Sequence, residues 1–158
     1  MRGIIISMAG LLLLQLAVPA LAEDKPADNM QIMLEKVRAD KKLLVANNMK
    51  LTEEEAKGFW PIYEAYQRDL QQVNGRLEKM LKSYADAYNK GPVSNETAKQ
   101  LLDEALAIDE SELQLKRSYV PKLEKVLPIS KVARYLQIEH KVRTAAKYEM
   151  ARLIPLVE

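Results

Sequence analysis

Few side chains in this sequence could bind a metal ion. The chain has no cysteine and a single histidine, His140, with Glu139 beside it. A helical metal site needs clustered His, Cys or Met ligands, and no carboxylate or sulfur stands three or four residues from His140. Met30 and Met33 lie one turn apart, but two thioethers alone make a poor site, and methionine often fills gaps in a core. We expect neither a metal ion nor a cofactor.

Catalytic groups are equally scarce. Carboxylates are plentiful, but none accompanies a recognisable nucleophile or metal-binding group, and the sequence has no glycine-rich loop. Acid–base catalysis also needs an enclosed pocket that shifts pKa values, and nothing in the sequence predicts one. We therefore predict that the protein is not an enzyme.

Aromatic and basic residues form the one pattern with a functional interpretation. A surface that binds partly folded chains needs exposed apolar groups interleaved with positive charge. The candidates are Phe59, Trp60, Tyr63, Tyr66 and Tyr119, with Lys122, Lys125, Arg134, Lys141 and Arg143 on the basic side.

An alternative interpretation of the same residues stays open. Aromatic residues at helical spacing are more often core than binding surface, and Tyr63 and Tyr66 are the strongest core candidates. Trp60 lies beside the apolar seam, so it is better placed as an exposed anchor or a dimer contact. The basic residues could simply form a solvated face that complements the acidic half of the molecule.

The elements that must position these residues are four helices. The chain has only five glycines, one phenylalanine and one tryptophan, against abundant helix formers. This composition predicts an all-α fold. Capping residues and apolar spacing place the helices at about 28–48, 52–89, 94–126 and 131–152, with Ser94 and Ser130 as caps of the last two.

The second helix is the most clearly marked. Thr52 and Glu55 form a capping box, in which each side chain satisfies a free backbone N–H. Apolar residues then recur at steps of three and four, which is typical of a coiled-coil seam. They are Phe59, Tyr63, Tyr66, Leu70, Val73, Leu77, Met80, Tyr84 and Tyr88.

Two prolines stand inside the predicted long helices. Gly91-Pro92 makes a short connection, so the second and third helices should form an antiparallel hairpin. Facing residue numbers then sum to about 182, which puts Pro61 opposite Pro121 and Tyr63 opposite Tyr119. Each proline kinks its helix, and two kinks at one height would curve the hairpin into a cradle. Alternatively, Pro61 merely ends a short first-turn helix.

The first 22 residues have the pattern of a secretory signal peptide. A positive start, an apolar run of about 15 residues and the small residues before Ala22 predict cleavage after Ala22. An uncleaved membrane anchor is the alternative. We expect residues 23–158 to form a single exported, periplasmic domain with no stable membrane insertion. Without cysteine it has neither a lipid-modified N-terminus nor disulfides, so packing alone must stabilise it.

Charge is unevenly spread over the predicted mature chain. Residues 23–114 carry 13 basic and 18 acidic side chains, a net charge of −5, whereas residues 115–158 carry 10 and 4, a net charge of +6. In an exported protein the partners of this basic third are its own acidic half, an anionic membrane surface or unfolded chains. We do not expect nucleic acid.

The sequence resembles the Spy/CpxP family of periplasmic stress proteins. The resemblance rests on Leu51, Thr52 and Glu55 opening a long helix, on the proline-bearing hairpin with Pro61 and Pro121, and on a proline-preceded fourth helix. The family signature is LTxxQ, and Glu55 replaces its glutamine. The second copy of that signature is echoed only by Leu127, Pro128 and Ser130, with Val132 where a polar residue would be expected.

The resemblance implies two functions between which the sequence leaves the choice open. One is an all-α cradle, an antiparallel homodimer that binds unfolded or stress-damaged envelope proteins without ATP. The other is a signalling or adaptor protein that docks on one envelope partner, such as a stress sensor. A broad mixed apolar and basic face favours the first, and a small patch near Trp60 and the fourth helix favours the second.

Overall fold

The computed structural model describes residues 26–157, with side chains from residue 36 onward. This part of the chain forms four helices and no strand: α1 (Pro26–Met49), α2 (Glu53–Tyr88), α3 (Asn95–Glu124) and α4 (Ile129–Leu153). The predicted all-α class is confirmed, and the helices begin and end close to where the sequence places them. The predicted signal peptide, residues 1–22, lies outside the described residues.

The caps that start α2 and α3 are those the sequence predicts. The Thr52 hydroxyl accepts from the Glu55 N–H at 3.2 Å, and the Glu55 carboxylate accepts from the Thr52 N–H at 2.8 Å. Ser94 caps α3 through the N–H of Thr97. The prediction for α4 was wrong, because the helix begins at Ile129 behind Pro128 and has no side-chain cap. Proline suits a helix start because its φ is already helical and it lacks the N–H that would need a partner.

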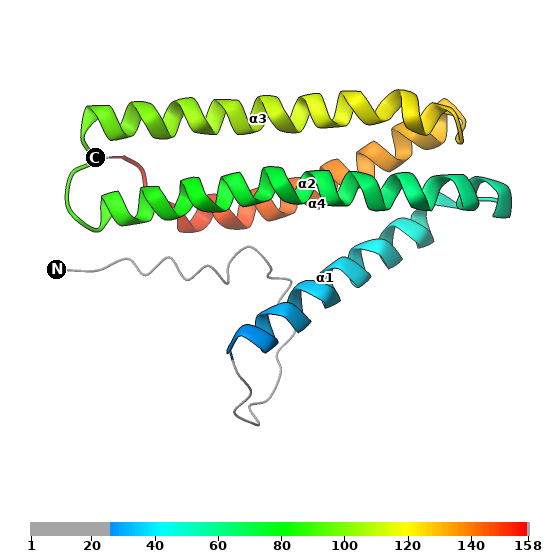
Figure 1. Ribbon diagram of the computed structural model, residues 1–158, viewed down its shortest axis with the longest axis horizontal. Coiled ribbons are helices and arrows are strands. Elements are labelled where there is room, and N and C mark those ends of the chain that lie inside the picture. The colour runs from blue at the N-terminus through cyan, green and yellow to red at the C-terminus, as the bar shows by residue number, and fades with distance from the viewer. Residues whose placement is uncertain (1–25, 158) are drawn as a thin grey trace.

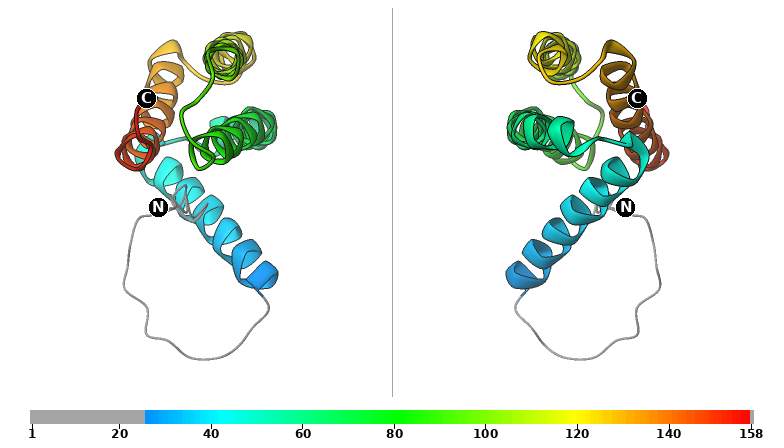
Figure 2. Two further views of the ribbon diagram at one scale, coloured as in Figure 1. Left: turned by 90° about the vertical axis from the view of Figure 1, so that its left-hand side faces the viewer. Right: turned by 90° about the vertical axis from the view of Figure 1, so that its right-hand side faces the viewer.

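The helices α2 and α3 form a long antiparallel hairpin, joined by a loop in which Gly91 adopts a φ of 135°. Figure 1 shows the two running side by side over most of their length. Seen end on in Figure 2, α2, α3 and α4 stand at the corners of a triangle, and α1 leaves this triangle obliquely. Only the C-terminal part of α1 therefore packs closely against the other helices.

The two prolines do not interrupt their helices. Both α2 and α3 continue as α-helix through Pro61 and Pro121, whose side chains are exposed. This excludes the alternative in which Pro61 ends a short helix. Figure 1 shows no sharp bend at either proline, so the matched kinks and the cradle shape are not confirmed.

The predicted facing pairs in the hairpin need correction. The Tyr119 ring meets the Tyr66 ring edge-on, with centroids 5.2 Å apart, and it makes no such contact with Tyr63. Tyr63 instead contacts Tyr135 of α4, at 6.1 Å. Counting residues outward from the loop gives only the position of a residue along the helix axis. The direction of its side chain around the helix decides which partner it contacts.

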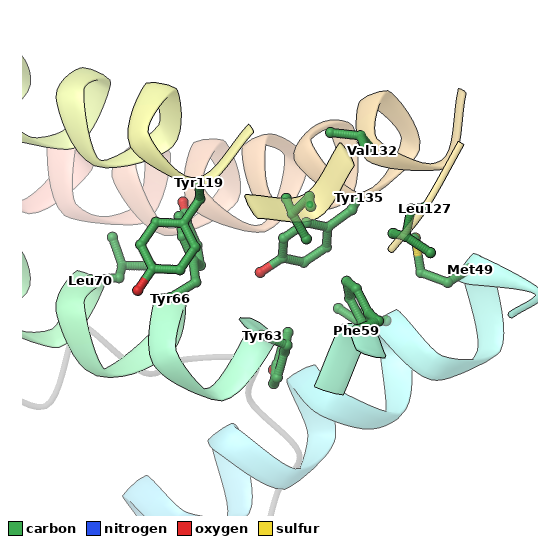
Figure 3. Close-up of a cluster of buried hydrophobic side chains, with 11 residues drawn as sticks. Met49, Phe59, Tyr63, Tyr66, Leu70, Tyr119, Leu127, Val132 and Tyr135 are labelled. Atoms are coloured by element: carbon green, nitrogen blue, oxygen red, sulfur yellow. The ribbon is translucent and has the colours of Figure 1, made fainter. Parts of the chain in front are cut away.

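The core lies at the end of the bundle where all four helices meet. Phe59, Tyr63 and Tyr66 of α2 surround Tyr135 of α4 with T-shaped ring contacts, as Figure 3 shows. Such edge-to-face pairs each contribute about 0.5–1.5 kcal/mol beyond the burial of area. Further buried side chains close the cluster: Val45, Met49, Leu70, Tyr119, Leu123, Leu127 and Val132.

Gly58 marks a close approach between α2 and the end of α3. A Cβ atom at position 58 would lie 2.7 Å from Val126 Cγ1, whereas nothing lies within 4 Å of one at Gly75. We expect Gly75→Ala to raise the free energy of unfolding by about 0.5–1 kcal/mol, because alanine is the better helix former. Gly58→Ala should instead lower it by roughly 1 kcal/mol, because overpacking outweighs that gain.

Urea unfolding of the two variants measures both effects, and Gly75→Ala is the matched control for Gly58→Ala. Equal stabilisation by the two substitutions would contradict the close contact between Gly58 and Val126.

Candidate functional site

Most of the aromatic candidates are part of the core. Phe59, Tyr63, Tyr66 and Tyr119 are all buried. The Tyr119 hydroxyl donates to Asp69 at 2.6 Å, and burial together with this hydrogen bond raises the pKa of Tyr119 to about 12. Burial also raises the pKa values of Tyr63 and Tyr66. The prediction that these four side chains form an exposed binding face is wrong for this conformation.

Trp60 is partly buried against the core. Its ring packs edge-on against Phe59 and Tyr63, with centroids 5.0 Å and 5.4 Å away. On its other side Lys42 Nζ of α1 lies 5.3 Å from the ring centroid, a cation–π contact. Trp60 is therefore shared between the rim of the core and α1, and it is not the free anchor that the sequence suggested.

The basic candidates fall into two groups. Arg143 points inward, where its guanidinium contacts the Glu112 carboxylate at 2.9–3.0 Å and donates to Asn74. Lys122, Lys125, Arg134 and Lys141 are exposed. Lys122 Nζ lies 3.9 Å from the Tyr119 ring centroid, and Arg134 donates to the Asn48 carbonyl at 3.4 Å. The ten candidates do not come together as one surface, and Arg143 is a structural residue.

Two buried carboxylates bind the helices to one another. Glu139 of α4 accepts from Lys41 of α1 at 2.7 Å and from Gln67 of α2 at 2.9 Å. Glu112 of α3 accepts from Arg143 of α4 and, at 2.7 Å, from Lys116. Each carboxylate is thus fully paired where it would otherwise be costly to bury. Neither glutamate was predicted from the sequence to be structural.

Glu55 has a second role besides its capping box. Lys131 of α4 donates to the Glu55 carboxylate at 2.5 Å and to the Lys50 carbonyl at 3.0 Å. The hydrogen bond from Lys131 lowers the pKa of Glu55. The predicted motif of Leu51, Thr52 and Glu55 therefore joins the start of α2 to the start of α4, which is a structural function.

Helix α3 carries a row of exposed leucines that was not predicted as a binding site. Leu102, Leu106 and Leu113 are 58%, 61% and 47% exposed. Their spacing of four and seven residues puts them on one side of the helix. These leucines were not among the candidate binding residues, although their spacing is visible in the sequence. We call Leu102, Leu106 and Leu113 the α3 leucine row.

Charged residues of both signs border the α3 leucine row. Lys99 and Asp103 pair at 2.7 Å, and Glu110 and Arg117 lie farther along the same side of the helix. An apolar strip next to mixed charge can contact many different chains weakly, because it needs no fixed geometry in its partner. This is the arrangement on the described surface that comes closest to the expected binding face.

Among the residues that the structure describes, no helix has the length and apolar character needed to cross a bilayer. The same residues hold no group of three or more His, Cys, Asp or Glu side chains arranged to hold a metal ion.

The pKa of Glu112 gives a prediction about acid stability. Burial alone would raise this pKa, but the hydrogen bond from Lys116 and the charge of Arg143 outweigh it and lower the pKa from 4.5 to about 2. A carboxyl whose pKa falls on folding stabilises the protein above its unfolded pKa, and this contribution is lost as pH falls through the folded pKa. We expect about 3 kcal/mol of stability to disappear between pH 4.5 and pH 2.

Urea unfolding at a series of pH values checks this contribution. Glu112→Gln should flatten the acid limb and lower stability at pH 7, because it leaves Arg143 buried without its counter-ion. Exposed Glu110 is the control, and Glu110→Gln should leave the acid limb unchanged. Identical acid limbs in the two variants would show that Glu112 does not carry this stability.

Comparison with known proteins adds no relative to this geometry. No protein-family model, no curated protein and no solved structure matches the chain significantly. The resemblance to the Spy/CpxP family therefore stays a prediction, and the function has to be argued from the chain's own residues.

Proposed function

We propose that the protein is an exported, ATP-independent chaperone-like protein that binds unfolded or stress-damaged envelope proteins. The observation that carries this proposal is the α3 leucine row, because three leucines on one helix face are left open to solvent. Four of the five aromatic candidates, Phe59, Tyr63, Tyr66 and Tyr119, are buried and do not contribute.

The expected strength of such contacts fits a holding function. Covering a half-exposed leucine contributes about 1 kcal/mol, so the row as a whole provides roughly 3 kcal/mol. Contacts of this size are weak and reversible unless several act together. A client that presents many apolar segments would be held by repeated contacts and released without an energy source.

The mixed charges beside the row support the same function. Four charged side chains beside the row keep this surface soluble and can pair with either sign of charge on a client. They are Lys99, Asp103, Glu110 and Arg117. A surface built for one partner would instead carry a buried aromatic anchor in a shaped pocket. Trp60 is the described residue closest to that type, and it is already partly covered by Lys42 and its aromatic neighbours.

Removing the row should weaken chaperone-like activity. We expect the triple variant Leu102→Gln, Leu106→Gln, Leu113→Gln to need on the order of tenfold more protein to suppress aggregation of a chemically denatured client. Light scattering at a series of protein-to-client ratios measures this, and circular dichroism confirms that the variant stays helical.

The matched control removes the same amount of apolar surface from scattered positions. Leu43, Ile129 and Leu153 are 55–62% exposed and lie far apart, Leu43 on α1 and the other two at opposite ends of α4. Their triple glutamine variant should suppress aggregation as well as the wild type does. If the wild-type protein does not suppress aggregation, the row is ruled out as the client surface. Equal weakening of aggregation suppression in the two triple variants would also rule it out.

The adaptor function makes a different prediction for Trp60. If the protein docks on one envelope partner through Trp60 and α4, Trp60→Ala should abolish crosslinking to that partner in cells. Under our proposal Trp60→Ala leaves the α3 leucine row intact, so we expect aggregation suppression within about twofold of wild type at a temperature where the variant is folded. A loss of suppression as large as that of the row variant would contradict this expectation.

A further inference from the structure

Helix α4 has two sharply different faces. Its inner face carries the buried residues Val132, Tyr135, Glu139 and Met150. Its opposite face is a continuous column of exposed side chains, spaced three or four residues apart. These are Arg134, Gln137, Lys141, Thr144, Tyr148 and Arg152, and we call them the α4 outer stripe.

The α4 outer stripe contains three cations and no acidic residue. Arg152 makes an exposed i,i+3 contact with Glu149 beside the stripe, and Arg134 donates to the Asn48 carbonyl. Exposed contacts of this kind contribute little to stability, so both arginines can exchange their present partners for an anion of a binding partner. No interaction is found for Lys141 among the described residues. From Arg134 to Arg152 the cations extend over about 27 Å of helix.

Other basic residues of the same region are already neutralised inside the molecule. Arg143 and Lys147 of α4 contact Glu112, and Lys131 contacts Glu55. The lysine and arginine residues of α4 therefore form two groups. One group binds α4 to its neighbours, and the other remains on the α4 outer stripe, where no described acid of another helix pairs with it.

Apolar and aromatic side chains gather at the C-terminal end of the stripe. Tyr148 is 63% exposed, and beyond it Leu153, Leu156 and Val157 are exposed, with Leu156 at 87%. The tail that carries them is held to the bundle, because the Tyr84 hydroxyl donates to the Pro155 carbonyl at 2.8 Å. Exposed leucine and valine are therefore presented on a fixed segment next to a cationic helix face.

We propose that the α4 outer stripe and the C-terminal tail form a docking surface for an anionic lipid bilayer. Lysine and arginine near a bilayer are attracted to its anionic headgroups, while tyrosine and exposed aliphatic residues enter the boundary between headgroups and acyl chains. A folded acidic protein would match the cations but not the exposed Leu156 and Val157. This combination of features favours the bilayer. The surface is separate from the α3 leucine row, so either can fail without the other.

Vesicle binding tests the proposal directly. The protein, purified as the cell processes it and with its N-terminus established by mass spectrometry, is sedimented with vesicles of phosphatidylglycerol and phosphatidylcholine. We expect binding that increases with phosphatidylglycerol content and falls as NaCl is raised. The triple variant Arg134→Gln, Lys141→Gln, Arg152→Gln should bind on the order of 100-fold more weakly.

The matched control removes three exposed cations from α2 and the loop after it. The variant Lys57→Gln, Lys79→Gln, Lys90→Gln changes the net charge by the same amount, and all three residues are exposed. We expect it to bind within about threefold of wild type. Equal weakening of the two variants would show an effect of net charge only, and no binding by the wild type would also overturn the proposal.

A second measurement reports on the orientation at the bilayer. In a Trp60→Phe background, Tyr148→Trp places the sole tryptophan on the α4 outer stripe, because the chain has only one natural tryptophan. We expect its emission to shift to the blue on vesicle binding and to be quenched by brominated lipid. In the wild-type chain the emission of Trp60 should change little. Binding without any change at position 148 would place the contact elsewhere and overturn the proposal.

Discussion

The fold depends on Tyr135 of α4 entering the aromatic end of the α2–α3 hairpin. Phe59, Tyr63 and Tyr66 meet its ring edge-on, and Tyr135 is fully buried among them. A two-helix hairpin alone leaves one side of its apolar seam in water, so it needs a third helix to cover that side. Because this insertion buries Phe59, Tyr63 and Tyr66, any surface that the protein offers to a partner must be built from side chains other than these three.

Charge pairing then sets how α4 lies across the hairpin. Glu139 of α4 accepts from α1 and α2, while Arg143 of α4 donates to Glu112 and Asn74 on α3 and α2. These buried contacts specify the rotation of α4 about its own axis, because a turned helix would leave a carboxylate or a guanidinium unpaired. The same rotation is what leaves the α4 outer stripe facing solvent.

Local features of the chain were predictable from the sequence, and the partners across helices were not. The capping box of Thr52 and Glu55 and the seam from Phe59 to Tyr84 depend on residues a few positions apart, so their spacing identifies them. The pairing of Tyr119 with Tyr66 depends on how two helices are rotated against each other, which counting along the chain does not give. Arg143 shows the same limit, since an arginine in a basic helix looks exposed until Glu112 is placed beside it. The α3 leucine row could have been found from its spacing alone.

The oblique course of α1 has a consequence for the order in which the molecule opens. Val45 and Met49 are its contributions to the core, and Lys41 makes part-buried hydrogen bonds to Gln67 and Glu139. Arg38 with Gln71 and Lys42 with Glu64 make exposed polar contacts, which contribute little and weaken in salt. The amide protons in the N-terminal part of α1 should accordingly exchange with solvent through local detachment, long before those of α2 and α3 exchange. The chain thus combines a firmly assembled core, which includes the C-terminal part of α1, with an N-terminal part of α1 that opens separately from it.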